Sequence, residues 1–450
     1  MAGPSGSGKT SLILTITGVI SNLLNGFVDG YVDLYGINPI DPEDFPKVPK
    51  FVGVVLQDPE KQLVMPTPAD EVSFTLENLG FTVTRESIMN SLKNVGLESR
   101  AYSPTEYLSG GEKKRLCIAA SIVHKPKLLI FDEPTANLDP WGVSEVINYI
   151  KRLKEEGSSV IVIEHKARHF LPLTDKLMVL INGEQKLNLT KDLISSKYEE
   201  VVNTLNNLGV DASKPNLTRR NELYTKPVVI TANDLWFRYP SSKEYVLKGV
   251  SLTLRKGEVG VVVGRNGSGK STLLKVLSGL YKPDKGSIKV PSLNGINGKV
   301  RKRNLVFYVP QEPDYMFIHN TVLKELQSCS NKSFNFDEVP WVKEVLNESP
   351  YKLSHGQRRW LSYLIAKLHS PEVVMFDEPT AGLDIRLLKQ FVNWVKDFVS
   401  EGKTVLIATH DVRVVCDIAT NAFIMSEGTL SQVSVEEARD YLEKPVEVIS

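Results

Sequence analysis

The sequence predicts an α/β fold that is present twice in one chain. A set of five short motifs occurs twice in the same order: a Gly-rich loop ending in Gly-Lys-Ser/Thr, a lone Gln, an LSxGx stretch, an apolar run ending in FDEPT, and a His after a further apolar run. The same 56-residue interval separates Ser109 from His165 and Ser354 from His410. Short apolar runs alternate with amphipathic segments, as in parallel sheets covered by helices. The 450 residues have room for two such domains.

Composition and charge narrow the class of protein. Hydrophobic residues are 42% and charged residues 24%, as in soluble globular proteins. The net charge of +1 gives no reason to expect nucleic acid as a partner. A basic cluster at 299–303 follows an Asn-Gly pair, and we interpret it as the solvated face of a hairpin. The three Cys lie far apart without metal-ligand spacing, which indicates thiols in a reducing compartment.

The sequence predicts a cytoplasmic protein. No stretch reaches the roughly 18 consecutive apolar residues that a membrane span needs. No basic and then apolar signal region follows Met1. If the protein acts at a membrane, another chain must span it.

The first domain is expected over residues 1–187. Its pattern predicts a helix over 9–24 and buried strands over 51–56, 128–132 and 159–163, which are largely apolar as parallel strands tend to be. The stretch between Gln57 and Ser109 is expected to form a helical insert, with 86–95 as its clearest helix.

A connecting segment is expected over 188–226, with a short helical pair or a capping element in 190–208 and a polar, turn-rich boundary at 215–221. The second domain, 227–450, is expected to open with strands over 228–237 and 259–263. Its helical insert, between Gln311 and Ser354, is shorter than the first. Ser434 followed by Glu437 predicts a capping box that starts one last helix.

The loops at 3–10 and 264–271 have the pattern of the phosphate-binding loop of P-loop NTPases. Glycines let successive backbone N–H groups point at phosphates, and the following helix adds its dipole. Lys9 and Lys270 supply a cation to the phosphates, and Thr10 and Ser271 a hydroxyl to Mg²⁺. The residues expected to bind nucleotide here are Gly3, Pro4, Ser5, Gly6, Ser7, Gly8, Lys9, Thr10 and Ser11, and Gly264, Arg265, Asn266, Gly267, Ser268, Gly269, Lys270, Ser271 and Thr272.

The two FDEPT runs each end an apolar strand with a pair of acids. The strand places the first acid at the carboxyl edge of the sheet, where ligands bind in such folds. Asp132 and Asp377 are expected to hold Mg²⁺ through water. Glu133 and Glu378 are expected to orient and polarise the attacking water.

The stretches LSGGE at 108–112 and LSHGQ at 353–357 complete a resemblance to the ABC ATPases that covers nearly the whole chain. The resemblance implies two RecA-like P-loop nucleotide-binding domains, each with a helical signature subdomain, that hydrolyse ATP with Mg²⁺. It also implies that two ATP molecules are buried between two halves arranged head to tail, each facing the signature stretch of the opposite half. The site of Lys9, Asp132, Glu133 and His165 would then include Ser354 and Gly356, and that of Lys270, Asp377, Glu378 and His410 would include Ser109, Gly110 and Gly111.

Further roles follow from the same resemblance. His165 and His410 would act with the glutamates in catalysis. Gln57 and Gln311 would sense the nucleotide, contribute to the Mg²⁺ site and couple to a partner, and Asp139 and Asp384 would be the D-loop acids. Two positions depart from the family pattern. Glu112 replaces Gln, which is a mild change, and His355 replaces Gly, which either adds bulk near the phosphates or points outward.

The stretch 57–80 resembles the ATPases of energy-coupling-factor importers, which take up vitamins and transition-metal ions. The resemblance is carried by Asp58, Pro59, Gln62, Asp70, Glu71, Val72 and Phe74. The second copy keeps Pro313 and Asp314 but has apolar residues at 315–317. These indicate a surface for a membrane partner's coupling helix, with buried core as the alternative. Partners would be the energy-coupling transmembrane component and the substrate-binding component, at the inner face of the cell membrane.

A second interpretation is a soluble tandem ABC ATPase that acts on ribosomes. The connecting segment is too short and too weakly charged for one such class, and the Cys-rich N-terminal domain of another is missing from the sequence as written. The sequence leaves open whether one chain pairs its own halves or two chains form a homodimer. It does not identify the transported substrate.

The two copies differ before their phosphate loops. The second has 36 residues from Val228 to Gly264, including Tyr239, which matches the aromatic residue that stacks on adenine in this family, and the strand 259–263. The first has only Met1 and Ala2. We therefore expect a misassigned start or a shortened chain, with Met1 as an internal residue of the missing strand.

Overall fold

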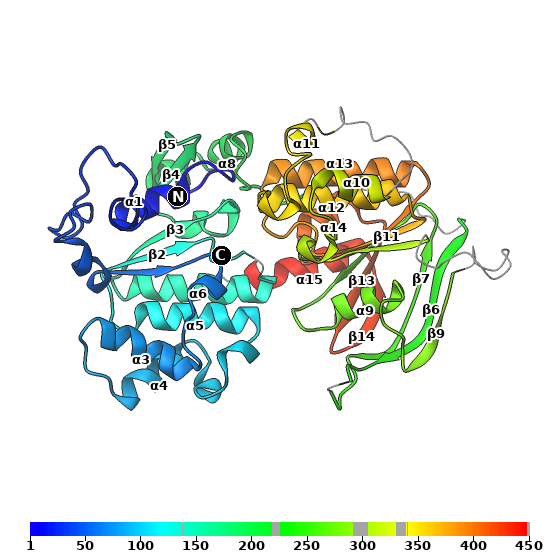
Figure 1. The fold of residues 1–450 in the computed structure, drawn as a ribbon, viewed down its shortest axis with the longest axis horizontal. Coiled ribbons are helices and arrows are strands. Elements are labelled where there is room, and N and C mark those ends of the chain that lie inside the picture. The colour runs from blue at the N-terminus through cyan, green and yellow to red at the C-terminus, as the bar shows by residue number, and fades with distance from the viewer. Residues whose placement is uncertain are drawn as a thin grey trace. The chain divides into compact units, whose positions relative to one another are not determined.

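The structure is a computed structural model that describes residues 1–136, 138–217, 226–240, 242–290, 305–329, 339 and 341–447. The basic cluster at 299–303 lies outside the described residues. The chain forms two compact units, Met1–Lys214 and Pro215–Val448. Both combine helices with a largely parallel sheet, which confirms the predicted α/β class (Figure 1).

The sheet of the first unit consists of three parallel strands in the order β1-β2-β3. These are β1 (Val52–Val55), β2 (Leu128–Asp132) and β3 (Ser159–Ile163), so each predicted strand is present. β2 is buried along its whole length because it pairs on both sides, with Ile130 opposite Val54 and Ile161. Its last residue, Asp132, therefore has a fixed position at the carboxyl edge.

Met1 and Ala2 extend this sheet beyond β3. Glu164 N donates to Met1 O at 3.0 Å, and Leu180 N donates to Ala2 O at 2.9 Å. Ala2 thus forms parallel bridges both to the end of β3 and to β4 (Lys176–Ile181), which pairs with β5 (Glu184–Thr190) in an antiparallel hairpin. In the second unit the corresponding place belongs to a full strand, β8.

The helix expected over 9–24 is two helices, α1 (Lys9–Ile16) and α2 (Val19–Asn22). They are separated at Gly18, which has a left-handed φ of 76°. A Cβ there would lie 2.0 Å from Pro39 O, so the close approach of the two backbones requires glycine. Apolar periodicity continues through this break, which is why the sequence pattern did not reveal it.

The predicted helical insert is present in the first unit. It contains α3 (Pro68–Asn78), α4 (Arg85–Asn94) and α5 (Gly110–Ile122), which lie side by side (Figure 1). Their N-caps are Thr67, Thr84 and Ser109, and each side chain accepts a hydrogen bond from the first turn of its helix. α6 (Pro140–Glu155) follows β2. Short 3₁₀ segments complete this unit: η1 (Phe45–Lys50), η2 (Pro59–Lys61), η3 (Glu98–Arg100), η4 (Thr105–Tyr107), η5 (Ala167–His169) and η6 (Leu171–Leu173).

The expected end of the first domain at residue 187 falls inside β5, and the compact unit extends to Lys214. The helical pair expected in this segment is formed by α7 (Lys191–Ser196) and α8 (Tyr198–Asn207). Both belong to the first unit because their apolar faces share a buried cluster with β4. After α8 the chain returns to the site, where Asp211 N donates to His165 O at 2.8 Å.

The second unit has a six-stranded sheet in the order β10-β11-β12-β8-β13-β14, parallel except for the last pair. A separate antiparallel sheet has the order β7-β6-β9. The strands are β6 (Val228–Phe237), β7 (Leu247–Arg255), β8 (Val259–Val263), β9 (Lys285–Lys289), β10 (Val306–Val309), β11 (Val373–Asp377), β12 (Thr404–Ala408), β13 (Asn421–Ser426) and β14 (Thr429–Val433).

The helices of the second unit are α9 (Lys270–Leu277), α10 (Val322–Cys329), α11 (Trp341–Glu344), α12 (His355–His369), α13 (Ile385–Ser400), α14 (Val412–Ile418) and α15 (Val435–Glu447), with 3₁₀ segments η9 (Pro313–Met316) and η11 (Pro350–Lys352). Helices α12 to α15 contribute to a buried cluster with the larger sheet, and α9 with strands β6 and β7 contributes to a second one. α10 and α11 pack with α12 in a separate cluster. Ser434 and Glu437 form the predicted capping box of α15. Of the described helices, none is both long and apolar enough to pass through a lipid bilayer.

Candidate active site

Each phosphate-type loop runs from a strand edge to a helix N-terminus that has no side-chain cap. Gly8 and Gly269 are the N-cap residues of α1 and α9, with left-handed φ values of 93° and 108°. A Cβ at Gly3 would lie 2.3 Å from Leu180 O, and one at Gly264 would lie 2.3 Å from Met425 O. The loops are thus packed against the neighbouring strand, and the uncapped N–H groups of each helix remain available for an anion.

The loop lysines lie across their own loops. Lys9 Nζ donates to Gly3 O at 2.9 Å and to Pro4 O at 2.8 Å. Lys270 Nζ donates to Gly264 O at 2.9 Å and to Arg265 O at 3.1 Å. Both lysines are buried, so each supplies a positive charge in a site of low solvent access. A phosphate group in the loop would meet this charge directly.

A hydroxyl–carboxylate pair stands beside each loop. Thr10 Oγ1 donates to Asp132 Oδ2 at 3.0 Å, and Ser271 Oγ donates to Asp377 Oδ1 at 2.9 Å. Burial raises the pKa of both aspartates above the usual range, although the hydroxyl bonds oppose this effect. A cation beside these hard oxygen donors would relieve the cost of burying their charge.

These residues fit Mg²⁺. Among the described residues no cluster of three or more His, Cys, Asp or Glu could hold a metal ion by itself. An ion bound by one hydroxyl and one carboxylate would take its remaining ligands from water and phosphate oxygens, which is how proteins commonly hold Mg²⁺.

The following glutamates have an unusual backbone. Glu133 and Glu378 have positive φ values of 46° and 44°, a conformation rarely adopted by residues other than glycine. Their amides are held by the next strand, with Glu133 N donating to Ile163 O at 3.0 Å and Glu378 N donating to Ala408 O at 2.9 Å. Such backbone outliers cluster at functional sites.

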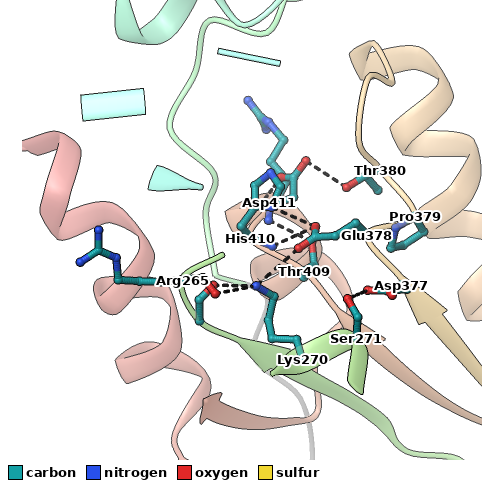
Figure 2. A network of polar contacts seen from close by, with 12 residues as sticks. Arg265, Lys270, Ser271, Asp377, Glu378, Pro379, Thr380, Thr409, His410 and Asp411 are labelled. Carbon is teal, nitrogen blue, oxygen red and sulfur yellow. Dashed lines mark hydrogen bonds and ion pairs between the residues drawn. The ribbon is translucent and has the colours of Figure 1, made fainter. Parts of the chain in front are cut away.

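Each glutamate faces a histidine. Nδ1 of His165 lies 3.6 Å from Glu133 Oε1, and Nδ1 of His410 lies 3.0 Å from Glu378 Oε2. Lys270 Nζ is 3.8 Å from Glu378 Oε1. Figure 2 shows these side chains of the second unit converging on Glu378.

The charges around the glutamates keep them ionised. Burial alone would raise the pKa of Glu133 and Glu378, but the neighbouring histidines and loop lysines hold both below the ordinary 4.5. Burial lowers the pKa of His165, and the carboxylate of Glu133 more than reverses this, so that its pKa is above the ordinary 6.5. At neutral pH both glutamates can accept a hydrogen bond from water.

The two Gln residues differ in the structure. Gln57 Nε2 donates to Glu133 Oε2 at 2.7 Å, which joins the segment after β1 to the glutamate. In the part of the second unit that the structure describes, Gln311 makes no such bond to Glu378.

The signature stretches are helix N-caps. Ser109 Oγ accepts from Glu112 N at 3.3 Å, and the Glu112 carboxylate accepts from Ser109 N at 2.8 Å. Ser354 and Gln357 repeat this capping box at 3.3 Å and 3.0 Å. Glu and Gln are therefore equivalent at this position, since each offers one acceptor oxygen to the N-cap amide. Gly110 and Gly111 open α5, and a Cβ at either would meet no atom within 4 Å.

The remaining predicted residues lie at or against the N-terminal ends of helices. Gly356 lies in the first turn of α12. The Tyr239 hydroxyl is 3.0 Å from Thr272 Oγ1, at the start of α9. Asp139 and Asp384 are the N-caps of α6 and α13.

His355 lies along its own helix, with Nε2 3.2 Å from an NH2 nitrogen of Arg359. Arg359 and its counterpart Lys114 bond the main-chain oxygens of Glu378 and Glu133, and neither contact was predicted from the sequence. The available signal was a basic residue five positions after the signature serine in both copies.

Comparisons with known proteins agree with this geometry. The sequence pattern of the family described as ABC transporter matches residues 1–136 and 247–381. A protein of Saccharolobus solfataricus named as an ABC transporter ATP-binding protein is 31% identical over 489 residues, with 99% of this chain and 91% of that protein covered. A Bacillus subtilis protein named as an HMP/thiamine import ATP-binding protein is 30% identical over 474 residues, covering 96% and 85%.

Among solved structures, an archaeal ribosome recycling factor, aABCE1, in complex with the ribosomal stalk protein aP1, has a TM-score of 0.68. The match covers 99% of this chain and 87% of that one at 21% identity. A ribosome-bound archaeal ABCE1 gives a TM-score of 0.70, also at 21% identity. At this identity the likeness shows the tandem fold alone.

Proposed function

We propose, since this chain belongs to the ABC transporter family and is a tandem ABC ATPase, that its ATP hydrolysis drives an energy-coupling-factor type importer for a vitamin or a metal ion. The chain would work at the inner face of the cell membrane with two membrane-embedded partners, an energy-coupling component and a substrate-binding component.

The observation that carries this proposal is an exposed apolar patch in each unit, on the segments that follow Gln57 or Gln311 and precede Ser109 or Ser354. The first patch consists of Val64, Tyr102 and Tyr107, which are 64%, 65% and 76% exposed. Hydrogen bonds join its segments, since Thr105 N donates to Pro66 O at 2.8 Å and Thr105 Oγ1 to Met65 O at 3.0 Å. It therefore lies between the segment after Gln57 and the start of α5.

The second patch consists of Tyr315, Ile318 and Tyr351, which are 85%, 85% and 53% exposed. Tyr351 OH donates to Phe317 O at 3.2 Å and joins the two segments. Of the apolar residues expected here at 315–317, Tyr315 faces solvent, whereas Phe317 is buried in the helical insert.

We infer that each patch receives a short apolar helix from the membrane-embedded energy-coupling component. Exposed aromatic side chains anchor interfaces at low entropic cost, and large exposed apolar groups mark binding surfaces. Val64 of the first patch belongs to the segment 57–80, which resembles importer ATPases and begins with Gln57, whose amide bonds Glu133. Movement of a docked helix would thus reach the catalytic carboxylate directly.

The chemistry at each site would run on this chain's own groups. Lys9 or Lys270 neutralises phosphate charge, Glu133 or Glu378 orients the attacking water, and His165 or His410 stabilises the charge that develops. Mg²⁺, when bound, supplies further neutralisation of the phosphates. The signature residues Ser109, Gly110 and Gly111, and Ser354 and Gly356, would complete two composite sites, each on the nucleotide held by the other half.

A second candidate function, action on ribosomes, is favoured by the fold shared with the recycling factor aABCE1. Its support is limited to the fold, whereas the HMP/thiamine import relative is 30% identical over nearly the whole chain. The two candidates predict different partners for the same ATPase.

Affinity purification of the full chain from its own cells would separate them. Detergent-solubilised membranes and a ribosome pellet are compared for the chain and for co-purifying proteins. We expect small integral membrane proteins to co-purify, and the double variant Tyr315→Glu with Ile318→Glu to lose them while keeping its ATPase activity. Leu280→Glu, an equally apolar and 61% exposed position in the same unit, is the control. Recovery only with ribosomes would show that the importer proposal is wrong.

A further inference from the structure

We propose that Lys114 and Arg359 are positioning residues that hold the catalytic glutamates in their left-handed backbone conformation. Through them each signature helix, α5 or α12, is attached to the catalytic loop of its own unit. The inference rests on the proposed catalytic role of Glu133 and Glu378, and its experiments keep the two claims apart.

In the first unit one ammonium group joins two loops. Lys114 Nζ lies 3.1 Å from Leu56 O, 3.0 Å from Gln57 O and 3.4 Å from Glu133 O. The side chain is 3% exposed, and its three protons match three carbonyl acceptors. Lys114 therefore connects α5 both to the segment that carries Gln57 and to the peptide of Glu133.

In the second unit the guanidinium of Arg359 bonds the corresponding catalytic loop. Arg359 NH1 donates to Glu378 O at 2.8 Å and to Pro379 O at 3.0 Å, and the side chain is 2% exposed. NH2 meets His355 Nε2 at 3.2 Å, so the residue that departs from the family pattern supports this cation from the first turn of the helix. Tyr363 OH adds a further hydrogen bond to Pro379 O at 2.5 Å.

The same kind of contact is present in both units, which favours a shared role for the two cations. Lys114 and Arg359 each lie five residues after the signature serine, and each reaches the main-chain oxygen of the glutamate. The side chains differ in length, shape and number of donors. The shared feature is a buried cation on that carbonyl oxygen, which indicates that the cation is what the position requires.

The glutamate peptide is thereby held on both sides. Its N–H bonds the neighbouring strand, at Ile163 O or Ala408 O. Its carbonyl oxygen accepts from the cation and also from the backbone N–H of Ala136 at 3.1 Å or of Ala381 at 3.3 Å. Without the cation, the strained conformation loses its one side-chain restraint among these hydrogen bonds and can relax toward the common regions of φ and ψ. The carboxylate would then turn away from the histidine and from the position of the attacking water.

The attachment also couples movement of the signature helix to the catalytic loop of the same unit. Ser109 caps α5 and Ser354 caps α12, and only about one and a half helical turns separate each serine from its cation. A ligand that binds at the signature stretch and shifts this helix would therefore shift the carbonyl of the glutamate as well.

The test compares Lys114→Met and Arg359→Met with two matched controls. Lys154 donates to Leu173 O at 3.0 Å, and Arg255 NH1 donates to Lys226 O at 3.1 Å, so each control also bonds a main-chain oxygen, but outside the site. We expect the double variant Lys114→Met with Arg359→Met to lose at least about tenfold in kcat for ATP, with KM changed by less than about twofold, because geometry and not nucleotide contact is lost. Lys154→Met and Arg255→Met should keep their kcat.

The repeat itself supplies the rescue. Lys114→Arg and Arg359→Lys exchange the cation types of the two units, and we expect both to retain most of the kcat that the methionine variants lose. Hydrogen exchange provides a readout independent of activity: the peptide 130–136 should exchange faster in Lys114→Met, and not in Lys154→Met. If a methionine variant does not fold, Lys114→Gln and Arg359→Gln, which keep a donor without the charge, carry the same expectation.

Normal kcat and exchange in folded variants would overturn the proposal, and so would equal losses in the control variants, which would indicate a general structural role. The double variant Glu133→Gln with Glu378→Gln tests the catalytic role of the glutamates separately from the positioning role of Lys114 and Arg359. If this pair keeps its ATPase activity, the catalytic roles are wrong. If it loses activity while Lys114→Met with Arg359→Met does not, only the positioning role fails.

Discussion

Tyr308 donates a hydrogen bond from its hydroxyl to Asp377 Oδ2 at 2.9 Å, whereas Val54 stands at the corresponding place in the first unit. The register of the strands establishes this correspondence, because Val54 pairs with Ile130 and Tyr308 with Met375, each two residues before the aspartate. With Ser271 on Oδ1, both oxygens of Asp377 are hydrogen-bonded. Asp132 accepts the corresponding hydroxyl bond from Thr10, but it has no counterpart of the Tyr308 bond because Val54 carries no side-chain donor.

This difference predicts that Tyr308→Phe weakens Mg²⁺ binding at the second site. Groups that orient a metal-binding carboxylate typically contribute 10- to 100-fold in metal affinity, and we expect an effect of about tenfold for a carboxylate that keeps its Ser271 bond. Electron paramagnetic resonance with Mn²⁺ and ADP would measure the affinity. Val54→Ile in the first unit is the control. An unchanged Mn²⁺ affinity in Tyr308→Phe would contradict the prediction.

Replacing the glutamates should remove most of the hydrolysis. Positioned general bases contribute about 10²- to 10⁴-fold, so Glu133→Gln with Glu378→Gln should lower kcat by at least about two orders of magnitude while ATP still binds. Phosphate release under saturating ATP measures the loss, and a fluorescent ATP analogue measures binding. Glu145→Gln, at an exposed ion pair with Arg115, should remain active. Loss of ATP binding together with hydrolysis would count against a purely catalytic role.

The ion pair of Glu133 and His165 predicts a pH effect with a defined sign. Removing the carboxylate in Glu133→Gln leaves burial as the main influence on His165, so its pKa should fall from above 6.5 to below 6.5. Nuclear magnetic resonance of the imidazole Cε1–H follows this titration. Glu378→Gln, in the other unit, should leave the His165 pKa unchanged. A higher His165 pKa in Glu133→Gln would refute the assignment of the pair.

The same pair should stabilise the first unit in a limited pH window. The raised pKa of His165 makes its contribution complete below 6.5, and the contribution is lost as the pH rises through the folded-state value. The lowered pKa of Glu133 makes its contribution complete above 4.5, and that contribution is lost as the pH falls through the folded-state value. Denaturant unfolding of the native chain and of Glu133→Gln should therefore differ most between pH 4.5 and 6.5. A constant difference from pH 4 to 9 would speak against this coupling.

Two capping boxes allow stability and activity to be separated. Ser354→Ala and Ser434→Ala each remove an N-cap, and each should lower the free energy of unfolding of the second unit by about 1 kcal/mol. Only Ser354 is a proposed nucleotide ligand, so only Ser354→Ala should also lower ATPase activity. Urea unfolding and ATP turnover of the two variants provide the comparison. Equal activity in both would remove Ser354 from the site.

Much of this arrangement could be predicted because strong local patterns determine it. β2, β3, β6 and β8 have the predicted bounds, since their apolar runs end at charged or glycine residues. The loop lysines, the hydroxyl–carboxylate pairs and the glutamate–histidine pairs also come together as their motifs predict. These groups are adjacent because parallel strands place their carboxyl ends at one edge of a sheet.

What escaped prediction depends on contacts that a local pattern does not encode. The break at Gly18 arises from the approach of Pro39, 21 residues away in sequence. No prediction singled out Lys114, which stands between two other basic residues at 113 and 115, and only the folded chain places its ammonium on three carbonyl oxygens. The sequence pattern assigned the residues of α7 and α8 to a connecting segment, yet both helices complete the core around β4.

The position of Asp211 has a mechanical consequence. The chain leaves the first unit only a few residues after a backbone bond to the carbonyl of His165, so this exit point is part of the catalytic edge and not a remote tether. Arg168 N also donates to Asp211 O at 3.2 Å, so the exit segment and the histidine loop hold each other at two backbone positions. Tension on the chain beyond Lys214 would therefore be transmitted to the loop that carries His165.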